Sequence, residues 1–229
     1  YKVGKIGNTL KLLDAAGSGA INANTGFITE CGRSFWTPTT LDNYWWFRPQ
    51  GGCLAVANSN QSNTPDGNIV EKGGQAYKLR AWANTYWRTV KTCPATLASC
   101  TGMTDFNNTN VTQTQLGASS TTERDKLINW QKGQDVDDER VRTWFETMRP
   151  SAHGDVLHSR PVALNYGTDG SPEIVVFYGG NDGMLRAVNG NRSASIDGVS
   201  AGDEFWSFVP PEFYTSIKRL RDNTTAISF

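Results

Sequence analysis

The chain has 229 residues, and its 22 lysines and arginines balance 22 aspartates and glutamates, so its formal net charge is zero. This charge gives no electrostatic argument for nucleic acid or an anionic membrane as a partner. Only 19% of the residues are charged while 11% are aromatic, a composition that argues against disorder and against a coiled coil. The 23 glycines and the many Asn, Thr and Ser residues instead predict a mainly β fold with polar turns.

The amino-terminal half is predicted to contain β-structure that is interrupted by two insertions. Residues 7–27 have the pattern of a hairpin that turns at residues 16–19. Residues 77–90 are rich in Trp and Tyr and indicate either a pair of strands or a strand with a helix. Two weakly patterned stretches, residues 31–74 and 91–120, have the length of functional loops or insertions.

The first of these stretches contains an aromatic cluster that we predict to be a contact surface. Its members are Trp45, Trp46, Phe47 and Arg48. Trp, Phe and Arg are typical anchors of protein interfaces, and large loops on a rigid scaffold are where recognition concentrates. The alternative is that these aromatic side chains bury the loop against the rest of the domain, and it fits the sequence equally well.

Four cysteines predict disulfide bonds and an oxidising compartment. Cys31, Cys53, Cys93 and Cys100 are even in number, and their spacing is unlike that of metal-binding motifs. Cys93 and Cys100 would close a short loop and are the preferred pair, which leaves Cys31 with Cys53. Four cysteines allow three pairings, so the connectivity stays open. Four buried free thiols are the alternative.

A helix is predicted over residues 121–132. Ser120 and Glu123 have the spacing of a capping box at its start, and Gly133 marks its end. The hydrophobic residues Leu127 and Trp130 then give the helix an apolar side.

An acidic segment follows this helix. Asp135, Asp137 and Asp138 offer oxygen ligands of the kind that Ca²⁺ prefers, but the segment does not match an EF-hand loop, and we favour a solvated acidic turn. His153 and His158 lie five residues apart and could suggest a metal or acid–base pair. Since no third ligand is nearby, structural hydrogen bonding is the favoured interpretation.

Residues 160–210 contain four apolar runs that are separated by turn sequences. They are residues 161–167, 173–180, 183–190 and 204–210. Four consecutive antiparallel strands in about fifty residues have the size of one β-propeller blade. The second run is apolar at almost every position, which predicts a strand covered on both faces, while the third and fourth alternate. An amphipathic helix is predicted directly afterwards, at 211–222.

These strands carry a resemblance to a known family. The segments GDVLHSRPVALNYG (154–167), IVVFYGGNDGMLRAVNG (174–190) and GDEFWSFVPPEF (202–213) resemble the PilY1/PilC family of type IV pilus tip proteins. The likeness extends upstream to residues 25–36, 65–80 and 124–139. It implies a mainly β fold, the front part of a modified β-propeller with quinoprotein-like blades, long loop insertions and two short helices, so that the chain is expected to be part of a larger propeller.

The resemblance also implies how the chain is organised. Residues 1–120 would hold the first propeller strands with their insertions, and residues 121–153 a helix and an acidic linker. Residues 154–229 would hold a complete four-stranded blade and the helix after it, all within one propeller. The family's calcium loop is expected in a later blade beyond this chain, so no cofactor, metal ligand or catalytic residue is carried over here.

The function that the resemblance implies is non-enzymatic. It is support of pilus biogenesis, surface adhesion and twitching motility, at the cell surface, the pilus tip, the periplasm or the outer membrane. The expected partners are minor pilins, the pilus tip and a host or abiotic surface ligand, without nucleic acid and without direct membrane insertion.

Two alternatives stay open. One is a periplasmic quinoprotein-like dehydrogenase, although the sequence lacks the adjacent cysteines expected of such enzymes, and Trp206 is interpreted as a blade-packing aromatic. No G-x-S-x-G, H-E-x-x-H or Walker sequence occurs in the chain. The other is a ligand-binding propeller that is unrelated to pili.

Overall fold

The computed structural model of the chain describes residues 1–29, 32–36, 73–80, 88–94, 96–137, 148–149 and 152–223. The fold of these residues is mainly β, as the composition predicted, with a two-stranded sheet and a six-stranded sheet. The strands are β1 (Lys2–Ile6), β2 (Thr9–Leu13), β3 (Val90–Thr92), β4 (Thr104–Asp105), β5 (Val162–Asn165), β6 (Ile174–Gly179), β7 (Leu185–Asn189) and β8 (Glu204–Val209).

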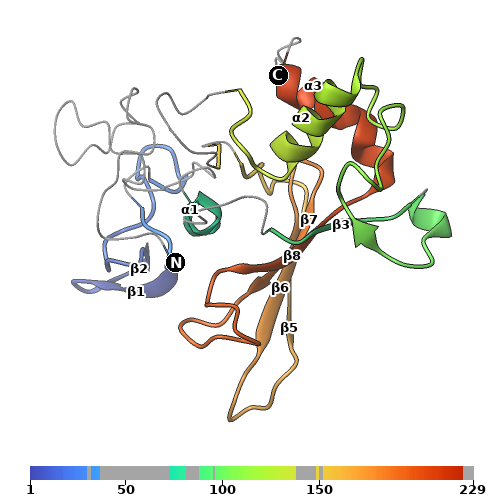
Figure 1. Ribbon diagram of the computed structural model, residues 1–229. Helices are drawn as coiled ribbons and strands as arrows, with labels where there is room; N and C mark the ends of the chain where they lie inside the picture. The colour runs from blue at the N-terminus through green and yellow to red at the C-terminus, as the bar shows by residue number, and fades with distance from the viewer. Residues whose placement is uncertain are drawn as a thin grey trace.

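The last four strands form the predicted meander. Strands β5 to β8 pair consecutively and antiparallel, and the hairpin of β5 and β6 extends away from the rest of the sheet (Figure 1). The β6–β7 turn contains Asp182 and Gly183, and Gly183 has a φ of +76°, a conformation that glycine adopts without steric cost. The sequence prediction of four strands joined by turns is therefore confirmed.

The sheet continues beyond these four strands. Its order is β4-β3-β8-β7-β6-β5, and β3 pairs with β8 in parallel while every other neighbouring pair in it is antiparallel. Strand β3 comes from the segment that the sequence left open between a strand pair and a strand with a helix. The described ends of that segment, 77–80 and 88–90, belong to the end of helix α1 (Gly74–Arg80) and to the start of β3, and residues 81–87 between them lie outside the described part of the chain.

The burial of the strands differs from the prediction. The sequence predicted the strand at 173–180 to be the one covered on both faces, but β6 is mostly half-buried, and β7 is buried at every position from Arg186 to Asn189. The place of each strand in the sheet and the hydrogen bonds of its side chains explain this difference. Strand β6 lies beside the exposed edge strand β5, whereas the polar side chains of β7 can be buried because they find hydrogen-bond partners.

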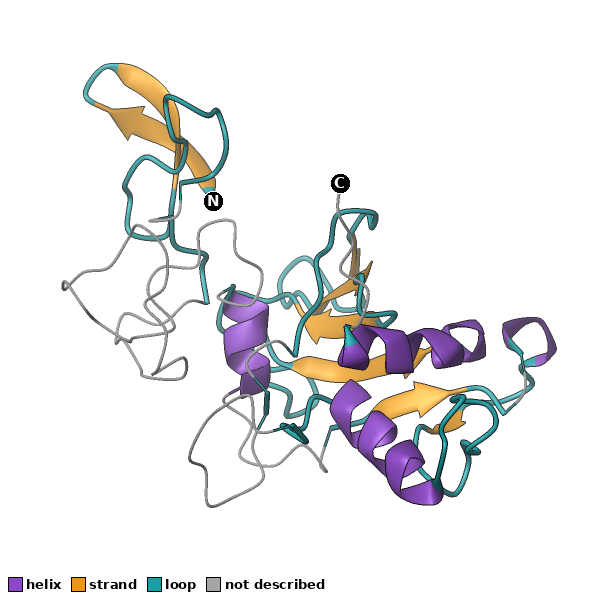
Figure 2. Cartoon of the chain, turned by 90° about the horizontal axis from the view of Figure 1, so that it is seen from above, coloured by secondary structure: helices purple, strands orange, loops and turns teal. Residues whose placement is uncertain are grey.

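The amino-terminal strands form a separate hairpin. Strands β1 and β2 pair from Lys2 with Leu13 to Ile6 with Thr9, so the regular hairpin turns at Gly7 and Asn8 rather than at residues 16–19. A second tight turn does occur near the predicted position, where the Asp14 amide donates to the Ser18 carbonyl. The hairpin lies apart from the six-stranded sheet in both views, with α1 between them (Figures 1 and 2).

Two further α-helices and two short 3-10 helices complete the described part. They are α2 (Thr121–Gln131), α3 (Tyr214–Asp222), η3 (Leu97–Ser99) and η4 (Pro211–Phe213). Half of the predicted capping box is present. The Ser120 side chain accepts a hydrogen bond of 3.1 Å from the Glu123 amide, whereas the Glu123 carboxylate accepts from the amide of Ser119 rather than that of Ser120. The predicted helix at 211–222 is also present, with a 3-10 turn as its first part.

The main hydrophobic core lies between helices α2 and α3 and the β3–β8 end of the sheet (Figure 2). Leu127 and Ile128 of α2 and Ile217 of α3 pack here with Val209 of β8. The insertion after β3 also contributes to this core through a set of fully buried side chains, Phe106, Val111 and Leu116. Part of the stretch 91–120, which the sequence predicted to be an insertion, therefore belongs to the hydrophobic core.

Across the part of the chain that the structure describes, no helix combines the length and the apolar character needed to cross a membrane.

Candidate functional site

Polar side chains form a row across one face of the six-stranded sheet. Tyr178 of β6 pairs with Arg186 of β7, and Arg186 pairs with Ser207 of β8, so these three side chains point to the same face. The neighbouring row, Phe177, Ala187 and Trp206, lies on the opposite face. The rings of Phe177 and Trp206 are 6.0 Å apart there, which agrees with the prediction that Trp206 packs within the sheet.

A β-bulge adds Glu204 to the polar row. The register between β7 and β8 shifts after Ala187, so that Val188 lies opposite Glu204 rather than Phe205. In a regular strand, residues three apart would point to opposite faces. With the bulge, the Ser207 hydroxyl reaches the Glu204 carboxylate at 3.1 Å. The bulge is therefore what brings a carboxylate onto the buried polar face.

Arg88 completes an ion pair with this carboxylate. It lies two residues before β3, and its Nε and Nη2 atoms donate to the two carboxylate oxygens of Glu204 at 2.8 and 2.9 Å. Both side chains are completely buried. Arg88 also donates from Nη1 to the carbonyl of Lys132 at 3.0 Å, which links the sheet to the end of α2.

A second buried ion pair lies beside the first. Arg186 donates to both carboxylate oxygens of Asp182, from Nη1 at 3.1 Å and from Nη2 in a closer contact. Its Nε atom lies 3.7 Å from the Glu204 carboxylate. Two guanidinium groups and two carboxylates thus form one buried charge cluster, defined by Arg88, Asp182, Arg186 and Glu204, whose formal charges cancel.

The electrostatics of the cluster favour the ionised forms of Asp182, Glu204 and Arg186. Burial favours the neutral forms of the carboxyl groups, but the charge and the hydrogen bonds of Arg186 lower the pKa of Asp182, and those of Arg88 lower the pKa of Glu204. Burial likewise opposes ionisation of Arg186, yet Asp182 raises its pKa. Each charge is stabilised by an opposite charge at hydrogen-bonding distance, and this compensation is what makes burial of four ions tolerable.

His153 and Tyr178 extend the charge cluster with neutral groups. The Nδ1 atom of His153 lies 2.8 Å from the Gly154 carbonyl, which can only accept, so Nδ1 carries the proton. The Nε2 atom therefore accepts from the Tyr178 hydroxyl, also at 2.8 Å. Burial and the positive charge of Arg186 lower the pKa of His153 to about 3, and burial raises the pKa of Tyr178.

Backbone contacts close the cluster on the side of the β6–β7 turn. The Asp182 carboxylate accepts from the amides of Gly154 and Met184 at 2.9 and 3.2 Å, and the Asp182 carbonyl accepts from Gln131 of α2 at 2.7 Å. A Cβ atom on Gly154 would lie 2.5 Å from the Asp182 amide nitrogen, so only glycine allows this approach. The hydrogen bonds and ion pairs of the cluster therefore connect β3, β7, β8, α2 and the segment at 152–155 to one another.

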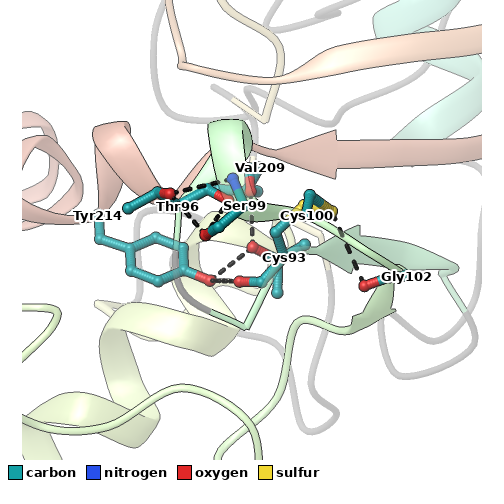
Figure 3. The surroundings of a disulfide bond; sticks show 8 residues. Cys93, Thr96, Ser99, Cys100, Gly102, Val209 and Tyr214 are labelled. Atoms are coloured by element: carbon teal, nitrogen blue, oxygen red, sulfur yellow. Dashed lines mark hydrogen bonds between the residues drawn. A yellow bond between two sulfur atoms is a disulfide. The ribbon is translucent and has the colours of Figure 1, made fainter.

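The disulfide between Cys93 and Cys100 is present as predicted, and it braces the end of β3 (Figure 3). Tyr214, the first residue of α3, donates to the Cys93 carbonyl at 3.4 Å and lies 2.5 Å from the Thr92 hydroxyl. Thr92 in turn donates to the Val209 carbonyl at the end of β8, at 2.7 Å. The disulfide loop, β8 and α3 are therefore joined at one point.

The other predicted site residues that the structure describes do not form a common site. Asp137 accepts two hydrogen bonds from Arg221 of α3, at 2.6 and 2.8 Å, and Asp138 lies outside the described residues. His153 is buried while His158 is exposed, so the two do not form a pair. Among the residues that the structure describes, no group of three or more His, Cys, Asp or Glu side chains is arranged to hold a metal ion.

Two predictions fall on residues that the structure does not describe. The proposed contact surface, Trp45, Trp46, Phe47 and Arg48, lies outside the described residues, and so do Cys31 and Cys53.

The sequence analysis missed the buried charge cluster. The sequence did contain one indication of a buried ion pair: a charged residue, Arg186, interrupts the apolar run of β7, and another, Glu204, precedes the aromatic run of β8. The partner Arg88, 116 residues before Glu204, carries no such signal.

No family model matches this chain, and comparison with curated proteins and with solved structures found no match either.

Proposed function

We propose that this chain is part of a non-enzymatic type IV pilus tip and assembly protein of the PilY1/PilC kind, which supports pilus biogenesis, surface adhesion and twitching motility. Its six-stranded sheet would contribute one blade to a modified β-propeller.

One observation carries the proposal. The three sequence segments with the family's pattern, residues 154–167, 174–190 and 202–213, are contiguous in space as the meander β5–β8 and the 3-10 turn that follows it. Four consecutive antiparallel strands are the unit from which propeller blades are built. The additional strands β3 and β4 extend the sheet beyond the four strands of a single blade.

The exposure of the edge strand supports the blade assignment. Val162 and Leu164 point to the same face of β5 and are 51% and 45% exposed. A blade within a propeller has further blades against its faces, and apolar side chains at such positions are covered in the ring. The exposed apolar residues of β5 fit a sheet that packs against more of the same architecture.

A mechanical role also fits the bonding of the described residues. A pilus tip protein is pulled when the pilus retracts, and its lifetime under force depends on the rate of unfolding. The buried charge cluster ties the start of β3 to the distant strand β8, and the disulfide between Cys93 and Cys100 closes a short loop at the end of β3. The disulfide also favours an oxidising location such as the periplasm or the cell surface. We propose minor pilins and a surface ligand as the partners there.

The proposal is tested in the source bacterium. A strain that lacks the gene is compared with the same strain after complementation with the full-length gene. Surface pili are measured by immunoblotting of sheared fractions, and motility by the diameter of twitching zones. We expect the deletion strain to lose pili and twitching, and complementation to restore both. Normal pili and normal motility in the deletion strain would overturn the proposal.

The enzymatic alternative is tested on the purified full-length protein. A quinoprotein dehydrogenase would reduce an artificial electron acceptor dye in the presence of alcohol or sugar substrates, and it would absorb light through its quinone. We expect no turnover and no quinone absorbance. Turnover that depends on a bound quinone would replace the proposed function by the enzymatic one.

A further inference from the structure

A cavity of about 310 Å³ lies between the amino-terminal segments and the connection from β7 to β8. The residues of its wall that matter here are aromatic or charged: Tyr1, Lys2, Asp14, Phe35, Trp36 and Arg192. A volume of this size lies at the lower end of the range of small-molecule sites and holds a ligand of one ring. None of the residues of the charge cluster or the disulfide loop lines it.

One aromatic residue of the cavity wall, Trp36, is fixed in place by close packing. Trp36 lies between Gly74 of α1 and Gly202 of the β7–β8 connection, and a Cβ atom on either glycine would come within 2.9 Å of Trp36. Gly202 also has a φ of +81°, which an L side chain rarely adopts. Phe35 meets Trp36 edge to face, with the ring centres 6.2 Å apart. Trp36 is therefore the packed part of this aromatic side, and Phe35 beside it is 52% exposed.

A cation is held against the same wall. The guanidinium of Arg192 lies 5.1 Å from the centre of the Phe35 ring, within the range of a cation–π contact. Arg192 is exposed, and it has no carboxylate partner among the described residues. A guanidinium that is positioned by a ring and free of a counterion can bind a carboxylate through two parallel hydrogen bonds.

Among the described residues that line the cavity, cationic side chains outnumber anionic ones. Lys2 and Arg192 bring two cations, and Asp14 brings one carboxylate. Asp14 is buried, and its two oxygens already accept from the backbone amides of Ser18 and Arg33, at 2.8 and 3.3 Å. Lys2, like Arg192, has no ion-pair partner in the described part of the chain. The cations are thus the groups that remain available to a ligand.

We infer that this cavity is a binding site for an acidic sugar. The carboxylate of the sugar would bind to Arg192 and Lys2, and the apolar face of its ring would pack on Phe35. The combination of an aromatic wall and two available cations suits a ligand with a carboxylate beside a flat apolar face, and the cavity volume admits one such ring. This inference goes beyond the proposed function, because it names the chemistry of a ligand and does not require that the chain belongs to a pilus.

The test measures binding of three probes to the full chain by ligand-observed NMR. The probes are D-glucuronic acid, D-glucose, which lacks the carboxylate, and acetate, which lacks the ring. We expect D-glucuronic acid to bind with a Kd in the millimolar range, and both other probes to bind at least about tenfold more weakly, since each loses one of the two contacts. Equal binding of glucose or of acetate would overturn the inference, as would no binding of glucuronic acid.

Two variants test whether the sugar binds in this cavity. Arg192→Ala and Phe35→Ala change exposed side chains, so the thermal unfolding midpoint should change only slightly while glucuronic acid binding weakens about tenfold. Lys126→Ala removes an exposed cation of α2 and should leave binding unchanged. Undiminished binding in both cavity variants would overturn the inference. Its failure is distinct from failure of the proposed function, which is decided by piliation and motility.

Discussion

Arg88 and Glu204 are 116 residues apart in the sequence, and their completely buried side chains form an ion pair with two hydrogen bonds. The pair connects the start of β3 to the start of β8, which are parallel neighbours in the six-stranded sheet. A buried ion pair is tolerated only while both charges are present, because either one alone would be a desolvated charge without compensation. Removal of either charge is therefore expected to destabilise the fold.

The first prediction concerns this pair. Arg88→Met should lower the free energy of unfolding by about 3–5 kcal/mol, since it leaves the Glu204 carboxylate buried without its main partner. The measurement is urea unfolding followed by Trp fluorescence. Arg88→Met combined with Glu204→Leu should lose less than the sum of the two single variants, because Arg186 and Asp182 remain as a balanced pair.

The matched control for this prediction is Lys126→Met, which removes an exposed cation from α2. It should change the free energy of unfolding by no more than about 0.5 kcal/mol. If Arg88→Met changed the free energy of unfolding as little as this control, the conclusion that the buried charge cluster stabilises the fold would be wrong.

The second prediction concerns pH. The pKa of His153 is about 3 in the folded chain, against 6.5 as its ordinary value, so the unfolded chain binds a proton more readily. The stabilisation from neutral His153 is complete above pH 6.5 and is lost as the pH falls toward 3, at up to about 1.4 kcal/mol per pH unit. His153→Gln should flatten the dependence of unfolding free energy on pH between 7 and 5.

The control for this prediction is His158→Gln, since His158 is exposed. This variant should keep the slope of the wild-type chain over the same range. An unchanged slope in His153→Gln would show that His153 is not the group that titrates on unfolding.

The third prediction concerns the disulfide. Replacing both Cys93 and Cys100 by Ser should lower the free energy of unfolding by about 2–3 kcal/mol under non-reducing conditions, the effect expected for closing a loop of this length. Thr101→Ala, a change of an exposed neighbour, is the control and should stay close to wild type. Peptide mapping of the oxidised chain should find the Cys93–Cys100 link, and a different pairing would contradict the structure.

The fourth prediction concerns the start of α2. Ser120→Ala removes the side-chain oxygen that accepts from the Glu123 amide and should cost about 1 kcal/mol. Ser120→Asp keeps an acceptor at this position and should retain most of the stability. Thermal unfolding of the two variants side by side distinguishes them, and equal losses would show that the cap contributes nothing.

Local patterns explain how much of the fold could be predicted. The strands at 160–210 follow from apolar runs and turn residues that lie within a few positions of each other, and the helix at 121–132 follows from its capping box. The Cys93–Cys100 pair could be preferred because a short loop brings its ends together without help from the rest of the fold. In each case the interacting residues are neighbours in sequence.

The sequence by itself therefore determined the mainly β class, the four-strand meander and its turns, and the helices at 121–132 and 211–222. Only the tertiary structure decided that β3 lies parallel to β8, that a bulge turns Glu204 inward, and that Arg88 meets it there. The cavity beside Arg192 and Phe35 likewise joins segments that are far apart in the chain. The physical reason is that such pairings depend on how distant segments pack. The sequence around an arginine does not indicate which carboxylate will compensate the burial of its charge.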